Sequence, residues 1–187
     1  MCIRDRALCV RSPIRRAFVK LSQPTVLDES LVPWLDKHLE MHGLTSDRLV
    51  LQVAESIADK HLKQTRTLAE HARARGYGFA LENFGVGARP QQVLKHLPLD
   101  FLKIDGSLMQ GLAGSTELQE RVNEYAATAR ERQIQTIAER VEDANTMAVL
   151  WQAGIEFLQG YQVQEPEVVL SEEPDAVVAD EETDKPD

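Results

Sequence analysis

The chain has 187 residues, of which 43% are hydrophobic and 27% are charged, and its formal net charge is −9 at pH 7. This length allows one domain with a hydrophobic core of its own, and no apolar run approaches the roughly 20 residues that span a bilayer. These values exclude membrane insertion, and the lack of a basic patch with interleaved aromatic residues argues against binding to polymeric nucleic acid.

The two ends of the chain differ from its middle. Residues 165–187 hold ten acidic residues and one lysine, which accounts for the entire net charge. We predict an acidic disordered tail over residues 167–187, either a solubilising tail or a docking peptide, because so little apolar surface cannot offset the entropy cost of ordering. Residues 1–16 are basic and have no periodicity, and we interpret them as an irregular segment that a truncation or a sequencing artefact produced.

Both cysteines, Cys2 and Cys9, lie in that first segment. A disulfide framework is therefore not expected, and the segment lacks the apolar stretch of a signal peptide. The sequence predicts a reducing, cytoplasmic location.

The first half of the middle region alternates short β-like runs with amphipathic helical stretches. The helix after the first run is indicated by a leucine every four residues from Leu31 to Leu39, with Asp28 or Ser30 available as its N-terminal cap. The next helix is predicted over residues 61–75 and ends at Gly76. The strands around these helices are predicted at residues 17–21, 49–54 and 78–83.

The second half continues the alternation. Its predicted elements are a short helix over 91–97, a strand over 101–105, a helix beginning at Ser115 or Thr116, a strand over 135–139, a helix from Asp143 to Gly154 and a strand over 156–161. Thr116 and Gln119 have the spacing of a capping box. Six such repeats are typical of a parallel barrel or a doubly wound sheet. A closed eightfold barrel takes about 250 residues, so a barrel of this length would lack roughly two units at its front.

Polar side chains follow the predicted strands at their C-terminal ends. Parallel barrels keep their active sites at this edge, where the loops after neighbouring strands converge. In chain order the side chains are Lys20, Gln52 and Glu55, Glu82 and Asn83, Lys103 and Asp105, Glu139 and Glu142, and Gln159.

Five stretches at these strand ends resemble, in order and spacing, the consecutive motifs of the EAL domain, a TIM-barrel family that hydrolyses cyclic di-GMP. They are QVAES, ENFGVG, LPLDFLKIDGSL, IAERVE and LQGYQVQEP. The resemblance covers residues 17–166. It implies an α/β fold, a (β/α)8 barrel of the TIM type that is N-terminally truncated to about six βα units.

In active members of that family, the Glu of the E-A-L signature, an Asn, a Glu and an Asp pair hold two divalent cations that activate the attacking water. Here the E-A-L segment is absent, and Lys20 stands in place of the Asn. Gln52 replaces the first Glu of E-x-x-E, and Glu82 with Asn83 replaces the Asp pair. The formal charge at these four positions thus changes from −3 to 0. Because Mg²⁺ requires anionic oxygen ligands, we expect no metal, no other cofactor and no catalytic residues.

The same edge is expected to bind the dinucleotide, with Lys20 meeting a phosphate where active relatives use metal ions. Glu55, the second Glu of E-x-x-E, is expected to anchor the loop NFGVGARP, which Arg89 and Pro90 make stiffer and more basic than the usual DFGTGYSSL. The expected ligand-binding residues are Lys20, Gln52, Glu82, Asn83, Lys103, Asp105, Glu139 and Gln159.

Structural roles remain open for some of these residues. Lys20 has the alternative of a solvated surface residue. Lys103 and Asp105 have the alternative of a buried ion pair with each other. Glu142 is expected in the first turn of the following helix, where the helix dipole favours an acidic side chain.

Within the family, FVKLS, QVAES and KIDGSLMQGL resemble the FimX-like group of type IV pilus regulators. Members of that group bind cyclic di-GMP without cleaving it and pass the signal to a PilZ-domain partner, so the resemblance implies a non-catalytic receptor domain. Two alternatives stay open: a metal-dependent phosphodiesterase with weak activity through Glu82, Asp105 and Glu139, and a scaffold that binds no ligand. Since a pocket lined by eight strands lacks its first wall here, we expect reduced or absent affinity for the 187-residue chain alone.

Overall fold

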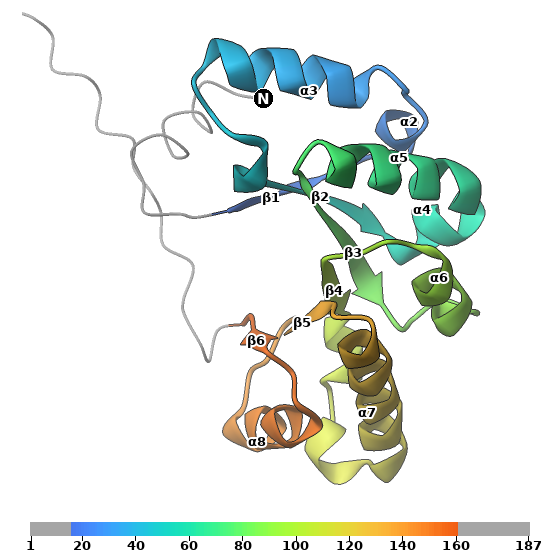
Figure 1. The fold of residues 1–187 in the computed structure, drawn as a ribbon. Coiled ribbons are helices and arrows are strands. Elements are labelled where there is room, and N and C mark those ends of the chain that lie inside the picture. The colour runs from blue at the N-terminus through green and yellow to red at the C-terminus, as the bar shows by residue number, and fades with distance from the viewer. Residues whose placement is uncertain (1–15, 161–187) are drawn as a thin grey trace, which may run out of the picture.

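The computed structural model describes residues 16–160, which form a curled parallel β-sheet with helices along its outer side (Figure 1). The strands follow one another in chain order across the sheet: β1 (Ala17–Lys20), β2 (Leu49–Ala54), β3 (Gly78–Phe84), β4 (Phe101–Ile104), β5 (Gln135–Ala138) and β6 (Phe157–Leu158). Each strand is parallel to the next, so every connection must cross over the sheet. This arrangement confirms the predicted partial (β/α)8 barrel of six units.

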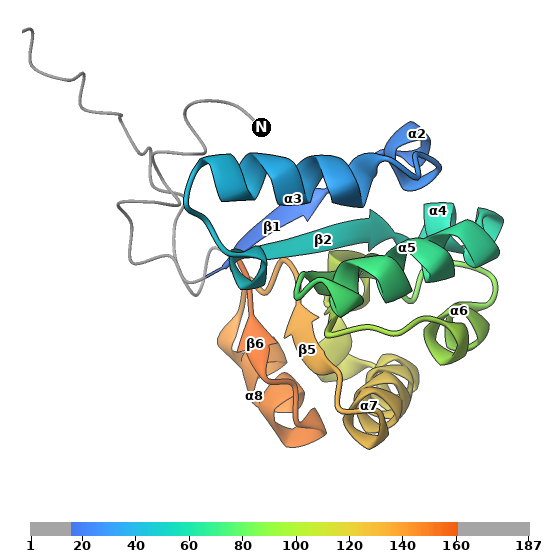
Figure 2. The ribbon, with the colours of Figure 1, turned by 45° about the horizontal axis from the view of Figure 1, so that its top comes forward.

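The crossover connections are helical, and both views place them on the outer side of the sheet (Figures 1 and 2). Within residues 16–160 the α-helices are α2 (Gln23–Val26), α3 (Leu31–Met41), α4 (Glu55–Lys60), α5 (Leu62–Ala74), α6 (Pro90–His96), α7 (Thr116–Glu131) and α8 (Ala144–Ala153). Short 3-10 turns are η1 (Ser46–Arg48), η2 (Gly106–Leu108) and η3 (Leu112–Gly114). None of the helices in this part of the chain is long and apolar enough to cross a membrane.

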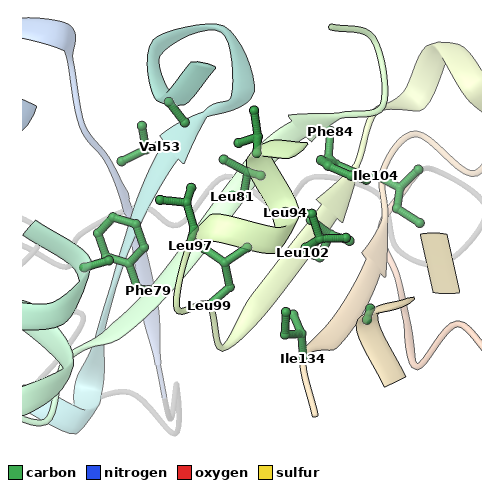
Figure 3. Packing of buried hydrophobic residues seen from close by; sticks show 14 of the residues in the cluster. Val53, Phe79, Leu81, Phe84, Leu94, Leu97, Leu99, Leu102, Ile104 and Ile134 are labelled. Carbon is green, nitrogen blue, oxygen red and sulfur yellow. The ribbon is translucent and has the colours of Figure 1, made fainter. Parts of the chain in front are cut away.

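Side chains alternate between the two faces of the sheet, and each face has an apolar cluster. Outward side chains such as Leu51, Phe79 and Leu102 belong to the main core beneath the helices, where Leu94 and Leu97 join them (Figure 3). The inner face carries a smaller cluster of Val50, Ala80, Phe101 and Ile137. β2 and β3 are therefore buried on both faces, which explains their nearly continuous apolar sequences.

The start of α7 differs from the capping box that the sequence predicts. Ser115 is the N-cap, and its Oγ accepts a hydrogen bond from the backbone nitrogen of Leu118 at 3.3 Å. Thr116 is the first helical residue, and Gln119 turns away from the cap to donate to the carbonyl oxygens of Leu112 and Ala113. The capping box of Thr116 and Gln119 is therefore wrong, because carbonyls of η3 compete for the glutamine amide.

The ends of the other helices were predicted with mixed success. The Asp143 carboxylate caps α8 by accepting from the Thr146 backbone nitrogen at 2.8 Å, and Gly154, with φ at 79°, ends that helix as predicted. Ser30 occupies the N-cap position of α3 without a side-chain cap, because its hydroxyl donates to Asp28 instead.

Two further elements depart from the prediction. Helix α4 was not predicted as a separate element, and the chain breaks between α4 and α5 at His61, which has φ of −125° and ψ of 46°. Strand β6 covers only two residues of the predicted 156–161. The proposed N-terminal segment up to residue 15, the rest of the predicted domain after residue 160 and the predicted acidic tail lie outside the described residues.

Candidate functional site

The parallel sheet brings the polar residues that follow the strands to one edge. Lys20 at the end of β1 lies opposite Gln52 on β2, and Ala54 at the end of β2 lies opposite Glu82 on β3. Each inward residue lies two positions beyond a residue of the inner apolar surface, as Gln52 does after Val50. The period of two therefore places Lys20, Gln52, Glu82, Lys103 and Glu139 on the inner face at the carboxyl edge of the sheet.

Lys20 and Glu82 form an ion pair that spans β2. The Lys20 Nζ lies 2.6 Å from the Glu82 Oε1, and the side chains are 62% and 6% exposed, respectively. Contact with the Glu82 carboxylate raises the pKa of Lys20, and the more distant charge of Glu139 adds to this effect against a small opposing contribution from burial. An exposed ammonium is thus held over a buried carboxylate.

Lys103 and Glu139 form a second pair, between β4 and the end of β5. The Lys103 Nζ lies 2.8 Å from the Glu139 Oε1, and the side chains are only 10% and 16% exposed. The same nitrogen lies 5.8 Å from the centroid of the Phe18 ring, which itself packs edge-on against Phe101 at 5.2 Å. The alternative that Lys103 pairs with Asp105 is wrong, because Glu139 takes the lysine.

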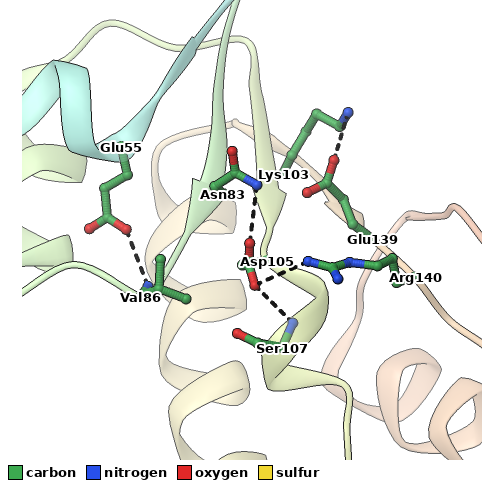
Figure 4. Close-up of polar contacts among 8 residues, drawn as sticks. All are labelled: Glu55, Asn83, Val86, Lys103, Asp105, Ser107, Glu139 and Arg140. Carbon is green, nitrogen blue, oxygen red and sulfur yellow. Dashed lines mark hydrogen bonds and ion pairs between the residues drawn. The ribbon is translucent and has the colours of Figure 1, made fainter.

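Asp105 is the centre of a third group, drawn in Figure 4. Its Oδ2 accepts from the Asn83 Nδ2 at 3.1 Å, and its Oδ1 accepts from the Ser107 backbone nitrogen at 2.8 Å. The Arg140 Nη2 lies 3.9 Å from the same Oδ1. Burial works against ionisation, but the hydrogen bonds from Ser107 and Asn83 and the charge of Arg140 outweigh it and lower the pKa of Asp105.

The backbone of Asn83 explains how its side chain reaches Asp105. Asn83 has φ of 52°, in the left-handed region that Asn tolerates better than most residues. The pairing of β3 with β4 shifts register between Leu81 and Phe84, around this residue. The irregularity turns the Asn83 amide along the edge towards β4, whereas Glu82 turns towards β1.

Glu55 makes the contacts that a loop anchor would make. Its buried Oε2 accepts from the backbone nitrogens of Gly85, Val86 and Gly87 at 2.9, 3.2 and 3.1 Å (Figure 4 draws the Val86 contact). A Cβ on Gly87 would lie 2.6 Å from the Glu55 Oε1, so the loop approaches the carboxylate as closely as glycine allows. The Arg121 guanidinium donates to the carbonyl oxygen of Gly85 at 2.9 Å and closes the loop from α7.

The remaining candidates lie at the same edge with fewer contacts. Gln52 is buried, and its Oε1 has no hydrogen-bond partner among the described residues. Gln159 is exposed, while its backbone is fixed by hydrogen bonds to Ala138 and Val141 at 2.9 and 3.0 Å. Glu142 precedes the N-cap Asp143, so its predicted place in the first turn of α8 is wrong.

Sequence reasoning missed Arg140. It directly follows the first glutamate of IAERVE, Glu139, and its side chain reaches the Asp105 group from the end of β5. The available signal was a charged residue at a strand end, the same signal that selected Lys20.

Comparison with known proteins decides the family. The sequence model of the EAL-domain family matches residues 3–166. The chain belongs to the EAL-domain family. It is 28% identical over 153 residues to the cyclic di-GMP phosphodiesterase PdeB of Shewanella oneidensis, a match that covers 82% of this chain and 18% of PdeB. The chain thus spans about a fifth of the length of the curated relatives that it matches.

Solved EAL domains share the fold described above. The FimX EAL domain of Pseudomonas aeruginosa, bound to cyclic di-GMP, is 36% identical with a TM-score of 0.80, over 87% of this chain and 66% of that one. The FimX EAL domain of Xanthomonas citri, in complex with the same dinucleotide, is 27% identical with a TM-score of 0.79, over 90% of this chain and 68% of that one. The resemblance to the FimX group is therefore supported at the level of the EAL domain.

Proposed function

We propose that this EAL domain is a receptor that binds cyclic di-GMP at the carboxyl edge of its sheet and does not cleave it. The observation that carries the proposal is the contact between Lys20 and Glu82 at 2.6 Å. It places an ammonium group where active relatives have ligands of a divalent cation. The complexes of FimX EAL domains with cyclic di-GMP support the choice of ligand.

The two cations that hydrolysis in this family requires do not fit the residues present. A divalent cation beside Glu82 would have to displace Lys20, and the Asn83 amide directs a nitrogen rather than an anionic oxygen towards Asp105. Within residues 16–160, no group of three or more His, Cys, Asp or Glu side chains lies close enough together to hold a metal. The proposal therefore includes no metal cofactor and no catalytic residue.

The edge offers suitable groups for a cyclic dinucleotide. Lys20 is exposed and flexible enough to exchange its contact with Glu82 for a phosphate oxygen. Gln52 presents a buried oxygen with no partner among the described residues, which suits a donor on a base or sugar. The proposed ligand-binding residues are Lys20, Gln52, Glu82, Asn83, Lys103, Asp105, Glu139 and Gln159, with Glu55 as anchor of the loop after β3.

The test is calorimetric titration of cyclic di-GMP into the protein at its full natural length, with and without a metal chelator. We expect the same affinity in both conditions and no linear dinucleotide after prolonged incubation with Mg²⁺ or Mn²⁺, as measured by chromatography. Linear product that forms only with metal would instead identify a weak phosphodiesterase, as the names of relatives such as PdeB suggest. Titration without heat in either condition would indicate a scaffold.

A finer part of the proposal concerns the pathway. We propose regulation of type IV pili in the cytoplasm through a PilZ-domain partner, supported by the likeness to FimX EAL domains and by the confinement of both cysteines to the first segment. The measurement is co-elution of the protein with PilZ-domain proteins of the same cell, with and without cyclic di-GMP. If cyclic di-GMP changes the co-elution of the protein with none of the PilZ-domain proteins, the proposed partner is contradicted, but the proposed ligand binding is not.

A further inference from the structure

Arg140 is held at the edge of the site by its backbone. It has φ of 55°, in the left-handed region that costs a long side chain of L configuration about 1 kcal/mol or more. Hydrogen bonds on both sides fix this conformation: the Glu139 nitrogen donates to Ile104 at 3.1 Å, and the Val141 nitrogen donates to Gln159 at 3.0 Å. The strained conformation directs the side chain back across the sheet edge towards β4 (Figure 4).

A glycine provides the space for this side chain. A Cβ on Gly106 would lie 2.6 Å from the Arg140 Nε and 2.7 Å from the Arg140 Cβ. The arginine therefore lies flat against the backbone that follows Asp105, where any other residue at position 106 would displace it. This packing distinguishes Arg140 from an arginine that extends freely into water.

The guanidinium itself is left with spare hydrogen-bonding capacity. Its one partner among the described residues is Asp105, at 3.9 Å, which is longer than a hydrogen bond. The side chain is 64% exposed. Asp105 already accepts hydrogen bonds from Asn83 and Ser107. The guanidinium thus has a fixed position and a positive charge, while its five N–H donors make no hydrogen bond to the described residues.

We infer that Arg140 is a ligand-contacting residue that donates to a phosphodiester oxygen of the cyclic dinucleotide. The inference rests on the proposed function and adds a residue to it. Arg140 approaches the site from β5, whereas Lys20 approaches it from β1, so the two cations serve a ligand with two phosphate groups from separate strands. The forked guanidinium suits the oxygens of a phosphodiester.

The experiment measures affinity for cyclic di-GMP by calorimetry on the full-length protein and its variants. We expect Arg140→Met to weaken binding by about tenfold and Arg140→Lys by a smaller factor, since a charge-assisted bond is lost or made less directional. Arg66→Gln, which removes one charge from an exposed pair on α5, is the matched control and leaves the affinity unchanged. An Arg140→Met variant with the affinity of the unchanged protein would overturn the inference alone, whereas no binding by the unchanged protein would overturn the proposed function as well.

The melting temperature of a variant distinguishes a ligand-contacting Arg140 from one that only stabilises the fold. Arg140→Gly removes the backbone strain together with the long, exposed ion pair and the packing against Gly106, and these effects oppose each other. We therefore expect a melting temperature within about 2 °C of that of the unchanged protein, while the affinity falls by about tenfold. A melting temperature several degrees lower would mean that Arg140 serves the fold, and the inference would fail.

A double variant with Asp105 distinguishes a direct contact of Arg140 with the phosphate from an indirect effect through Asp105. If Arg140 contacts the phosphate itself, Arg140→Met still costs about tenfold in affinity in a protein that already carries Asp105→Asn. If Arg140 acts only by holding Asp105, the second substitution adds nothing, and the inference is overturned.

Discussion

Lys20 with Glu82 and Lys103 with Glu139 are ion pairs of the same chemistry at the same edge of the sheet, yet their surroundings differ. Lys103 is 10% exposed and lies near the ring of Phe18, and Glu139 is 16% exposed. Lys20 is 62% exposed because it ends β1, the strand at the edge of the described sheet. The difference in exposure predicts that the inner pair contributes more to stability, whatever it adds to ligand binding, whereas the proposed role of the outer lysine is to exchange its partner for a ligand.

Breaking the inner pair should have the largest effect. We expect Lys103→Met to lower the free energy of unfolding by about 3 kcal/mol, because it leaves the Glu139 carboxylate poorly hydrated and unpaired. Urea denaturation measures the change. The control is the double variant Lys103→Met with Glu139→Leu, which removes both charges and should recover most of the loss. A single variant within about 0.5 kcal/mol of the unchanged protein would mean that the two pairs do not differ.

A third carboxylate extends the comparison. Glu55 is buried with no lysine partner among residues 16–160, and three backbone nitrogens donate to it instead. Gly87→Ala places a methyl group 2.6 Å from the Glu55 Oε1, and we expect it to lower the free energy of unfolding by about 2 kcal/mol. Gly114→Ala is the matched control, because a Cβ there meets nothing within 4 Å. Equal stabilities of the two alanine variants would show that the loop does not depend on Glu55.

Removing the outer lysine should affect binding more than stability. We expect Lys20→Met to weaken the binding of cyclic di-GMP by about tenfold, or about 1.4 kcal/mol, and to lower the free energy of unfolding by less than about 1 kcal/mol. Calorimetry and urea denaturation give the two values. Lys95→Met, at an exposed position of α6, is the control for charge. A Lys20 variant that loses more stability than affinity would assign the outer pair to the fold.

The smallest expected effect is the pH dependence of stability that arises from Asp105 and its hydrogen-bond partners. The pKa of Asp105 is lower in the folded protein than its ordinary value, so its contribution to stability is complete above about pH 4 and is lost as pH falls through the folded pKa. The pKa values of Asp28 and Asp143 are lowered as well, by hydrogen bonds from Ser30 and Thr146. Asp105→Asn should therefore lose less stability than the unchanged protein between pH 5 and pH 3, though not none, in urea denaturation. Identical losses would contradict the lowered pKa of Asp105.

The alternation of apolar runs predicted the strands and their parallel direction, because a βα repeat requires a crossover between parallel strands. It left a barrel and a doubly wound sheet open, and the resemblance to the EAL domain was needed to select the barrel. Capping was less predictable. Asp143 caps α8 as its position before the helix suggests, whereas the Gln119 amide donates to carbonyls at the start of η3 that no spacing rule anticipates. Helix α4 was missed because its sequence, ESIADK, shows no apolar repeat of its own.

Most residues that meet at the carboxyl edge of the sheet could be predicted, but their pairing could not. Lys103 and Asp105 are neighbours on one strand, and only the register of β5 shows that Glu139 takes the lysine. Likewise, Lys20 reaches over β2 to Glu82 because the sheet curls. Arg140 was missed for a related reason, since its direction depends on a left-handed backbone conformation that its residue type disfavours.

The amide of Asn83 has an electrostatic consequence for the edge of the sheet. Two carboxylates at positions 83 and 105 would repel each other unless a cation lay between them, whereas the amide nitrogen donates directly to Asp105. The amide N–H of Asn83 thus provides the positive partner for the Asp105 carboxylate that a cation would provide between two carboxylates.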